Sequence, residues 1–166
     1  IPGAPSFSYT PADFWRLDGY EVVWRSGRSM LQIPPGGNRT TGEALLYFTG
    51  QSARYDIHID CLDEPDGAST LTAALNGTVL GAHTLDETPA DGQDTVATWT
   101  TPGIDVQRNS CLLLSGTADE GEYCRVVAVR FEPAGRFQGE LLPYAQLPAP
   151  PSLRVYTLNT DRRAAR

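Results

Sequence analysis

The sequence lacks the features that mark several common classes of protein. Its 166 residues include three cysteines, no CxxC pair and only two histidines, so no zinc-binding pattern is present. No apolar run approaches the ~20 residues of a membrane-spanning helix, and no signal peptide is visible. No G-x-S-x-G, H-E-x-x-H or P-loop motif occurs. These absences argue against a zinc protein, an integral membrane protein and the commonest hydrolases.

Positive charge is also scarce. The chain has 13 Lys and Arg against 20 Asp and Glu, which gives a formal net charge of −7. Nucleic acids and anionic membranes attract concentrated positive charge, so neither is an expected partner. Carboxylates are abundant, but they lie in predicted loops with no evident shielded cleft to raise the pKa of one of them. We therefore expect no enzyme activity.

Glycine and proline are plentiful and separate many short apolar segments. Residues 55–61 alternate, with Tyr55, Ile57 and Ile59 on one face and the polar residues on the other, which is typical of a half-buried strand. Asn76-Gly77 is a strong hairpin signal. About nine strands are expected, at residues 20–26, 28–33, 43–50, 55–61, 70–75, 78–85, 95–106, 110–116 and 123–133.

No amphipathic helix of ten residues is visible between positions 20 and 132. The fold class that this predicts is all-β, an antiparallel two-sheet jelly-roll β-sandwich. Residues 1–133 form the predicted sandwich domain, and residues 134–166 a Pro-rich C-terminal linker or extension. Because the sequence does not begin with Met, we expect it to be a segment of a longer protein.

Two acidic turns stand out. Asp63, Glu64 and Asp66 follow the strand at 55–61, and ADEGE, at 118–122, precedes the last strand. If these two strands are antiparallel neighbours, both turns lie at one end of the sandwich, with Arg125 close enough to neutralise part of the charge. Carboxylates this close repel one another. The end is then a solvated rim, a Ca²⁺ site that orders the loops, or a set of hydrogen-bonding groups for a ligand.

From Tyr20 to Pro133 the order of motifs resembles the jelly-roll carbohydrate-binding modules of the family 6, 35 and 36 type. The resemblance lies in a strand that ends in DEPDG, in the Asn-Gly hairpin, in a threonine-rich strand with Trp99, and in the G-x-x-D-x-G-E-Y-x-R pattern from Gly116 to Arg125. Such modules bind polysaccharide through aromatic platforms and polar loops and have no catalysis of their own. Their structural Ca²⁺ site is doubtful here, because Pro11-Ala12-Asp13-Phe14 stands where the family opens with a Glu-rich strand, and Val127 stands where the family has an Asp before its closing strand.

The resemblance implies a polysaccharide ligand, either at the loop end that includes the turn before the last strand or on the concave face of a sheet. The candidate ligand-binding residues are Trp15, Tyr20, Trp24, Trp99, Asp119 and Glu120. An aromatic ring suits the apolar C–H face of a sugar. For each aromatic residue the alternative is packing in the core. The candidate ligands of a Ca²⁺ ion are Asp63, Glu64, Asp66 and Glu122.

Cys111 and Cys124 flank the turn-like stretch SGTADEGEY. If the flanking segments form a hairpin, the two cysteines come within reach of a disulfide bond. The alternative is that all three cysteines are small buried apolar residues.

The function that these observations predict is non-catalytic polysaccharide binding by a module of a larger enzyme, one that is secreted, periplasmic or at the cell surface. The rival hypothesis is a structural or protein-interaction β-sandwich that does not bind sugar. Exposure of two or more of Trp15, Tyr20, Trp24 and Trp99 around one cleft would favour sugar binding, and burial of all four would favour the rival.

Overall fold

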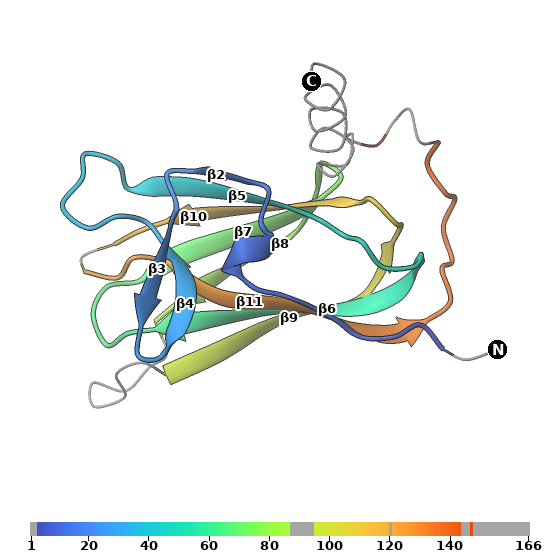
Figure 1. The fold of residues 1–166 in the computed structure, drawn as a ribbon, viewed down its shortest axis with the longest axis horizontal. Coiled ribbons are helices and arrows are strands. Elements are labelled where there is room, and N and C mark those ends of the chain that lie inside the picture. The colour runs from blue at the N-terminus through green and yellow to red at the C-terminus, as the bar shows by residue number, and fades with distance from the viewer. Residues whose placement is uncertain (1–2, 87–94, 120, 144–146, 148–166) are drawn as a thin grey trace, which may run out of the picture.

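Two antiparallel sheets pack face to face in the computed structural model, which describes residues 3–86, 95–119, 121–143 and 147 (Figure 1). This confirms the predicted all-β sandwich. The described elements are β1 (Phe7–Tyr9), a 3-10 helix η1 (Pro11–Asp13), β2 (Arg16–Asp18), β3 (Glu21–Arg25), β4 (Arg28–Gln32), β5 (Thr41–Tyr47), β6 (Ala53–Asp63), β7 (Ser69–Leu75), β8 (Thr78–Leu85), β9 (Thr95–Val106), β10 (Cys111–Thr117) and β11 (Arg125–Gly135).

The strands are distributed between a first sheet in the order β3-β4-β11-β6-β9, with β1 also paired to β11, and a second sheet in the order β2-β5-β10-β7-β8. The last of the described strands, β11, therefore lies near the middle of the first sheet. Its antiparallel pairing with β6 runs from Arg125 opposite Leu62 to Gly135 opposite Arg54. The prediction that these two strands are antiparallel neighbours is confirmed.

The core is filled by the inward faces of both sheets. Along β6 the expected alternation holds, since Tyr55, Ile57 and Ile59 are fully buried and the residues between them are partly exposed. At one end of the core Phe7, Tyr9, Phe48, Tyr55 and Phe131 form a cluster with ring centroids 4.7 to 6.5 Å apart, mostly edge to face. That arrangement is the one aromatic quadrupoles favour.

The predicted Asn-Gly hairpin joins β7 to β8. Asn76 and Gly77 have φ values of 48° and 84°, a left-handed pair that matches the right-handed twist of the flanking strands. In contrast, β1, η1 and β2 fall in the first 19 residues, where the sequence predicted no strand.

The first residues of the predicted C-terminal extension pack against the sandwich. Strand β11 continues to Gly135, two residues past the predicted boundary. The backbone N–H of Gln138 donates to Asp105 (3.0 Å), and the side-chain amide of Gln107 both donates to and accepts from the backbone of Leu142 (2.8 and 2.7 Å). Residues 148–166 lie outside the described residues, so their assignment as a linker stays a prediction. No helix in the described ranges has the length and apolarity needed to cross a membrane.

The predicted hairpin between Cys111 and Cys124 is wrong. Consecutive strands β10 and β11 belong to different sheets, and Cys111 pairs with Tyr47 on β5. All three cysteines are free. Cys61 and Cys124 are buried and Cys111 is half-buried. The alternative hypothesis, three small apolar residues, fits this structure.

The cysteines should differ in reactivity. Burial raises the pKa of the Cys61 thiol far above its usual value and also raises the pKa of Cys124 and of Cys111. Because the thiolate is the reactive form, we expect a disulfide reagent such as DTNB to label one thiol slowly in the folded protein and three after unfolding. Cys111→Ser should abolish the labelling of the folded protein. An intact mass that rises on reduction would show that two of the thiols are in fact joined.

Candidate functional site

The two acidic turns meet at one end of the sandwich, as the pairing of β6 with β11 requires. The carboxylate of Asp119 accepts a hydrogen bond from the backbone N–H of Ala68 (3.0 Å), and Asp119 and Glu122 close their own turn through two backbone hydrogen bonds. Gly67, at φ +75°, packs so closely on the carbonyl oxygen of Asp119 that a Cβ atom has no room. We call this region, with Asp63, Glu64, Asp66, Asp119 and Glu122, the acidic end.

Arg125 neutralises part of this charge. It is 3% exposed, forms an ion pair with Glu64, and donates from Nε to the Gln32 side chain (3.1 Å). Arg25, on β3, approaches the same Glu64 oxygen at 3.6 Å. A buried guanidinium needs such partners, because removing a charge from water costs several kcal/mol. The predicted role of Arg125 at this end is therefore confirmed.

Two further carboxyl groups of the acidic end are buried. Asp63 and Glu122 are each 1% exposed. Burial, followed by the neighbouring carboxylate of Asp63 and then Glu64, raises the pKa of Glu122 to about 8. At neutral pH Glu122 therefore carries a proton, which removes one negative charge from the acidic end.

The described carboxylates of the acidic end do not form a cluster of metal-ligand spacing. A Ca²⁺ ion takes six to eight oxygen atoms, yet no group of three carboxylate, histidine or cysteine side chains converges on one point in the described part of the chain. Glu64 is engaged by two arginines, and Asp63 and Glu122 are buried below it. A Ca²⁺ ion held by Asp63, Glu64, Asp66 and Glu122 stays a prediction.

A hollow of about 360 Å³ opens beside the acidic end. It is lined by Arg25, Glu64, Pro65, Asp66, Gly121, Tyr123 and Arg125, and we call it the loop cleft. Tyr123 is half-buried, with the Arg125 guanidinium 5.0 Å from its ring centroid. Tyr123 also lines a second hollow, with Asp119 and the loop from Pro34 to Thr40. The cleft thus combines an aromatic ring with charged groups of both signs.

The four predicted aromatic residues do not line the loop cleft. Trp24 is 74% exposed on β3, next to Arg25. Trp15 is half-buried, its ring 5.3 Å from that of Tyr47. The prediction that Tyr20 contacts a sugar is wrong. Tyr20 is only 6% exposed, and its hydroxyl donates to the backbone carbonyl of Cys124 (3.0 Å). The residue therefore fixes the turn before β11.

Trp99 lies elsewhere, between the two sheets at their open side. It is half-buried, and its indole stacks on the His83 ring, with centroids 5.7 Å apart and planes 12° apart. The two side chains come from the edge strands β9 and β8, and Trp99 also packs against the core. One face of the indole is therefore already occupied.

Of the predicted polar ligands, Asp119 is exposed but accepts the Ala68 hydrogen bond, and Glu120 lies outside the described residues. Sequence reasoning missed Tyr123 and Arg25 as lining residues. Tyr123 is the tyrosine of the GEY stretch, so its place beside the acidic turn was the signal. Arg25 carried no signal, because it reaches the cleft only through the pairing of the β3–β4 hairpin with β11.

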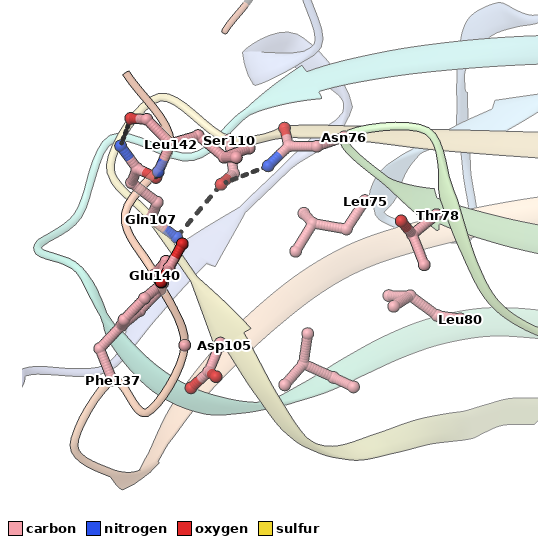
Figure 2. A pocket seen from close by; sticks show the side chains of 12 residues that line it. Leu75, Asn76, Thr78, Leu80, Asp105, Gln107, Ser110, Phe137, Glu140 and Leu142 are labelled. Carbon is pink, nitrogen blue, oxygen red and sulfur yellow. Dashed lines mark hydrogen bonds between the residues drawn. The ribbon is translucent and has the colours of Figure 1, made fainter. Parts of the chain in front are cut away.

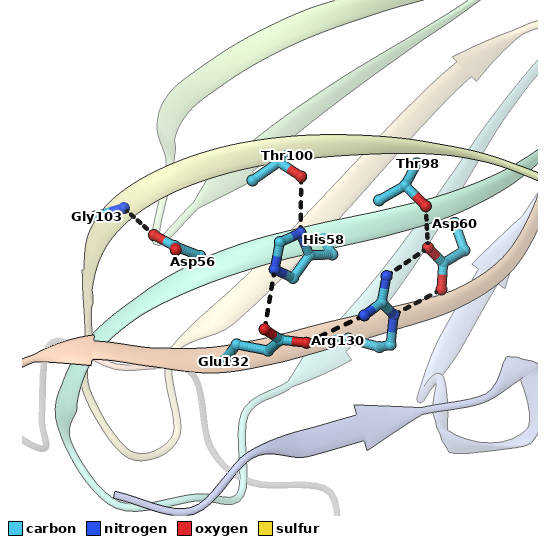
Figure 3. Close-up of polar contacts among 8 residues, drawn as sticks. All are labelled: Asp56, His58, Asp60, Thr98, Thr100, Gly103, Arg130 and Glu132. Atoms are coloured by element: carbon cyan, nitrogen blue, oxygen red, sulfur yellow. Dashed lines mark hydrogen bonds and ion pairs between the residues drawn. The ribbon is translucent and has the colours of Figure 1, made fainter. Parts of the chain in front are cut away.

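A second polar surface covers the outer face of the first sheet (Figure 3). Arg130 donates to both carboxylate oxygens of Asp60 (2.8 and 3.0 Å), Thr98 donates to the same group, and His58 bridges Thr100 and Glu132. Although burial opposes it, hydrogen bonds from Arg130 and Thr98 hold the pKa of Asp60 below its usual value. These groups satisfy one another and include no Trp, Tyr or Phe, so this face offers less to a sugar than the loop cleft.

Comparison with solved structures identifies the fold. A family 35 carbohydrate-binding module from Clostridium thermocellum matches with a TM-score of 0.58 at 11% identity, over 79% of this chain and 100% of that chain. The C-terminal family 6 module of a laminarinase from Zobellia galactanivorans matches with a TM-score of 0.53 at 15% identity, over 77% and 99%. No family model and no curated protein sequence matches the chain.

The chain therefore has the β-sandwich fold of family 6 and family 35 carbohydrate-binding modules. The fold also occurs in other settings. The insecticidal crystal protein Cry2Aa matches with a TM-score of 0.59 at 15% identity, over 77% of this chain, and the chain spans 21% of the length of that protein. The fold alone therefore does not define the function of this chain.

Proposed function

We propose that the chain is a non-catalytic carbohydrate-binding domain that holds a polysaccharide in the loop cleft. The observation that carries this proposal is Tyr123, a half-buried ring that lines two adjoining hollows beside charged hydrogen-bonding groups. The ring would pack on the C–H face of a sugar, while Arg25, Glu64 and Asp66 would bond its hydroxyl groups. The shared fold with family 6 and 35 modules supports this proposal.

We also propose that the domain is part of a larger enzyme that is secreted, periplasmic or at the cell surface. The C-terminal position of the matched family 6 module within a laminarinase supports this arrangement. The rival is a protein-interaction domain. The specific observation in its favour is the exposure of Val22 and Trp24 on the edge strand β3, at 49% and 74%.

Affinity gel electrophoresis against plant and algal polysaccharides tests the proposal. On a polysaccharide that retards the domain, Tyr123→Ala should weaken binding at least ten-fold, because a central aromatic anchor typically contributes about 2 kcal/mol or more. Tyr123→Phe, which keeps the ring, should retain most of the affinity.

Trp24→Ala is the matched control, since Trp24 is an exposed aromatic residue that does not line the cleft. Its affinity should stay near that of the unmodified domain. Loss of binding in Trp24→Ala but not in Tyr123→Ala would move the site out of the loop cleft. Retardation by no polysaccharide would favour the rival.

A further inference from the structure

Another hollow lies at the opposite end of the sandwich from the acidic end, between the edge strands β8 and β9 (Figure 2). Its volume is about 340 Å³, within the usual range for small-ligand pockets. The hairpin of β7 with β8 forms one side, the end of β9 another, and the segment from Phe137 to Leu142 lies across it. We call it the edge pocket.

The edge pocket has an apolar lining. Leu75 and Leu80 come from the second sheet, Ile104 from the first, and Phe137 and Leu142 from the C-terminal segment. Figure 2 shows Leu75 and Leu80 on one side of the hollow and Phe137 on the opposite side. The pocket therefore gives apolar contact from three directions where the two sheets diverge.

The C-terminal wall of the pocket is fixed by hydrogen bonds. Gln107 binds the backbone of Leu142 through both atoms of its amide, and Asp105 accepts from the backbone N–H of Gln138. Arg54 donates to the Gln138 side chain at 2.7 Å and lies 4.0 Å from Asp105. These hydrogen bonds within the chain fix the position of the wall.

The neutral polar groups of the pocket bond one another. Asn76 donates to the Ser110 hydroxyl (3.0 Å) and accepts from the backbone of Cys111 (2.8 Å), and Ser110 accepts from the backbone of Gln107 (3.1 Å). The charged groups that line the hollow are Asp105 and Glu140, both negative; Arg54, 4.0 Å from Asp105, offsets part of that charge, so Glu140 supplies the open carboxylate. Glu140 is exposed and has no ion pair within the described ranges. An apolar hollow edged by carboxylates favours a cation with an apolar body.

We propose that the edge pocket binds a small organic cation, a primary ammonium group carried on an aryl or alkyl body. The apolar body lies against Leu75, Leu80 and Ile104, and the ammonium group faces Glu140 and Asp105. This site differs from the loop cleft in position and in the chemistry of its ligand, so either one can fail without the other.

Three aryl probes of similar size and different charge test this proposal: benzylammonium, benzyl alcohol and benzoate. In ¹H–¹⁵N spectra of the whole chain, benzylammonium should shift the amide signals of residues 75–80, 104–107 and 137–142. Benzyl alcohol should bind about two- to five-fold more weakly, the range of an exposed ion pair, and benzoate more weakly still. Polysaccharide should not displace benzylammonium.

Two variants separate the apolar and the charged contributions. Glu140→Gln should remove most of the advantage of benzylammonium over benzyl alcohol. Leu80→Trp should fill the hollow and abolish binding of all three probes. Thr78→Trp, at an exposed position of the same hairpin, serves the same purpose if Leu80→Trp does not fold. Shifts that cluster outside the pocket, or equal affinity for the three probes, would overturn the proposal.

Discussion

Replacing Arg125 by alanine should lower the free energy of unfolding by about 3–5 kcal/mol. Arg125 is almost completely buried, and its partner Glu64 keeps only 11% of its side chain exposed. Without the guanidinium, Glu64 remains in a poorly hydrated position with only Arg25, at 3.6 Å, to offset its charge. Urea denaturation followed by tryptophan fluorescence measures the loss.

Arg39→Ala is the matched control for Arg125→Ala. Arg39 pairs with Asp18 at 2.6 Å, but both side chains are about half exposed, and a surface ion pair contributes about 0–1 kcal/mol. The double variant Arg125→Met, Glu64→Leu should recover much of the stability, because it leaves no unpaired buried charge. Equal losses for Arg125→Ala and Arg39→Ala would contradict the central role assigned to Arg125.

Stability should fall as the pH rises from about 5 to 8, and Glu122 should cause much of that fall. The folded-state pKa of Glu122, about 8, lies above the ordinary value of 4.5, so the folded state binds the proton more tightly than the unfolded state does. The stabilisation is complete below pH 4.5 and is lost as the pH passes through 8. A difference of this size corresponds to at most about 5 kcal/mol.

Glu122→Gln keeps a neutral side chain of the same size at every pH. Its unfolding free energy should exceed that of the unmodified chain by a few kcal/mol at pH 9, and the two should converge near pH 5. Glu43→Gln, at a half-exposed carboxylate on β5, is the matched control. Parallel profiles for Glu122→Gln and the unmodified chain would show that Glu122 is ionised in the folded state.

The sequence predicted the sandwich well because alternation and turn chemistry are local. The period of two in β6 and the Asn76-Gly77 turn each specify their own conformation. The meeting of the acidic turns was also predictable, since it follows from one assumed pairing, β6 with β11. The N-terminal strands β1 and β2 were missed because each has three residues, too few to show a period.

The pairing of Cys111 with Cys124 failed because no local signal distinguishes a hairpin from a crossing between sheets. The stretch between β10 and β11 has the composition of a hairpin turn, yet it passes from one sheet to the other. The exposure of aromatic residues is equally non-local. Tyr20 and Tyr123 each lie beside a strand end, and only the packing of distant strands buries the first and leaves the second in a cleft.

The central place of β11 has a consequence for synthesis of the chain. The five strands of the second sheet come from residues 16–117, whereas the first sheet lacks a middle strand until residues 125–135 have been made. Until then β6 has only β9 beside it, and β1 and β4 have no partner from the centre of their sheet. During translation the nascent chain must therefore keep the edges of the first sheet exposed until β11 has been made, and closure of the core awaits that strand.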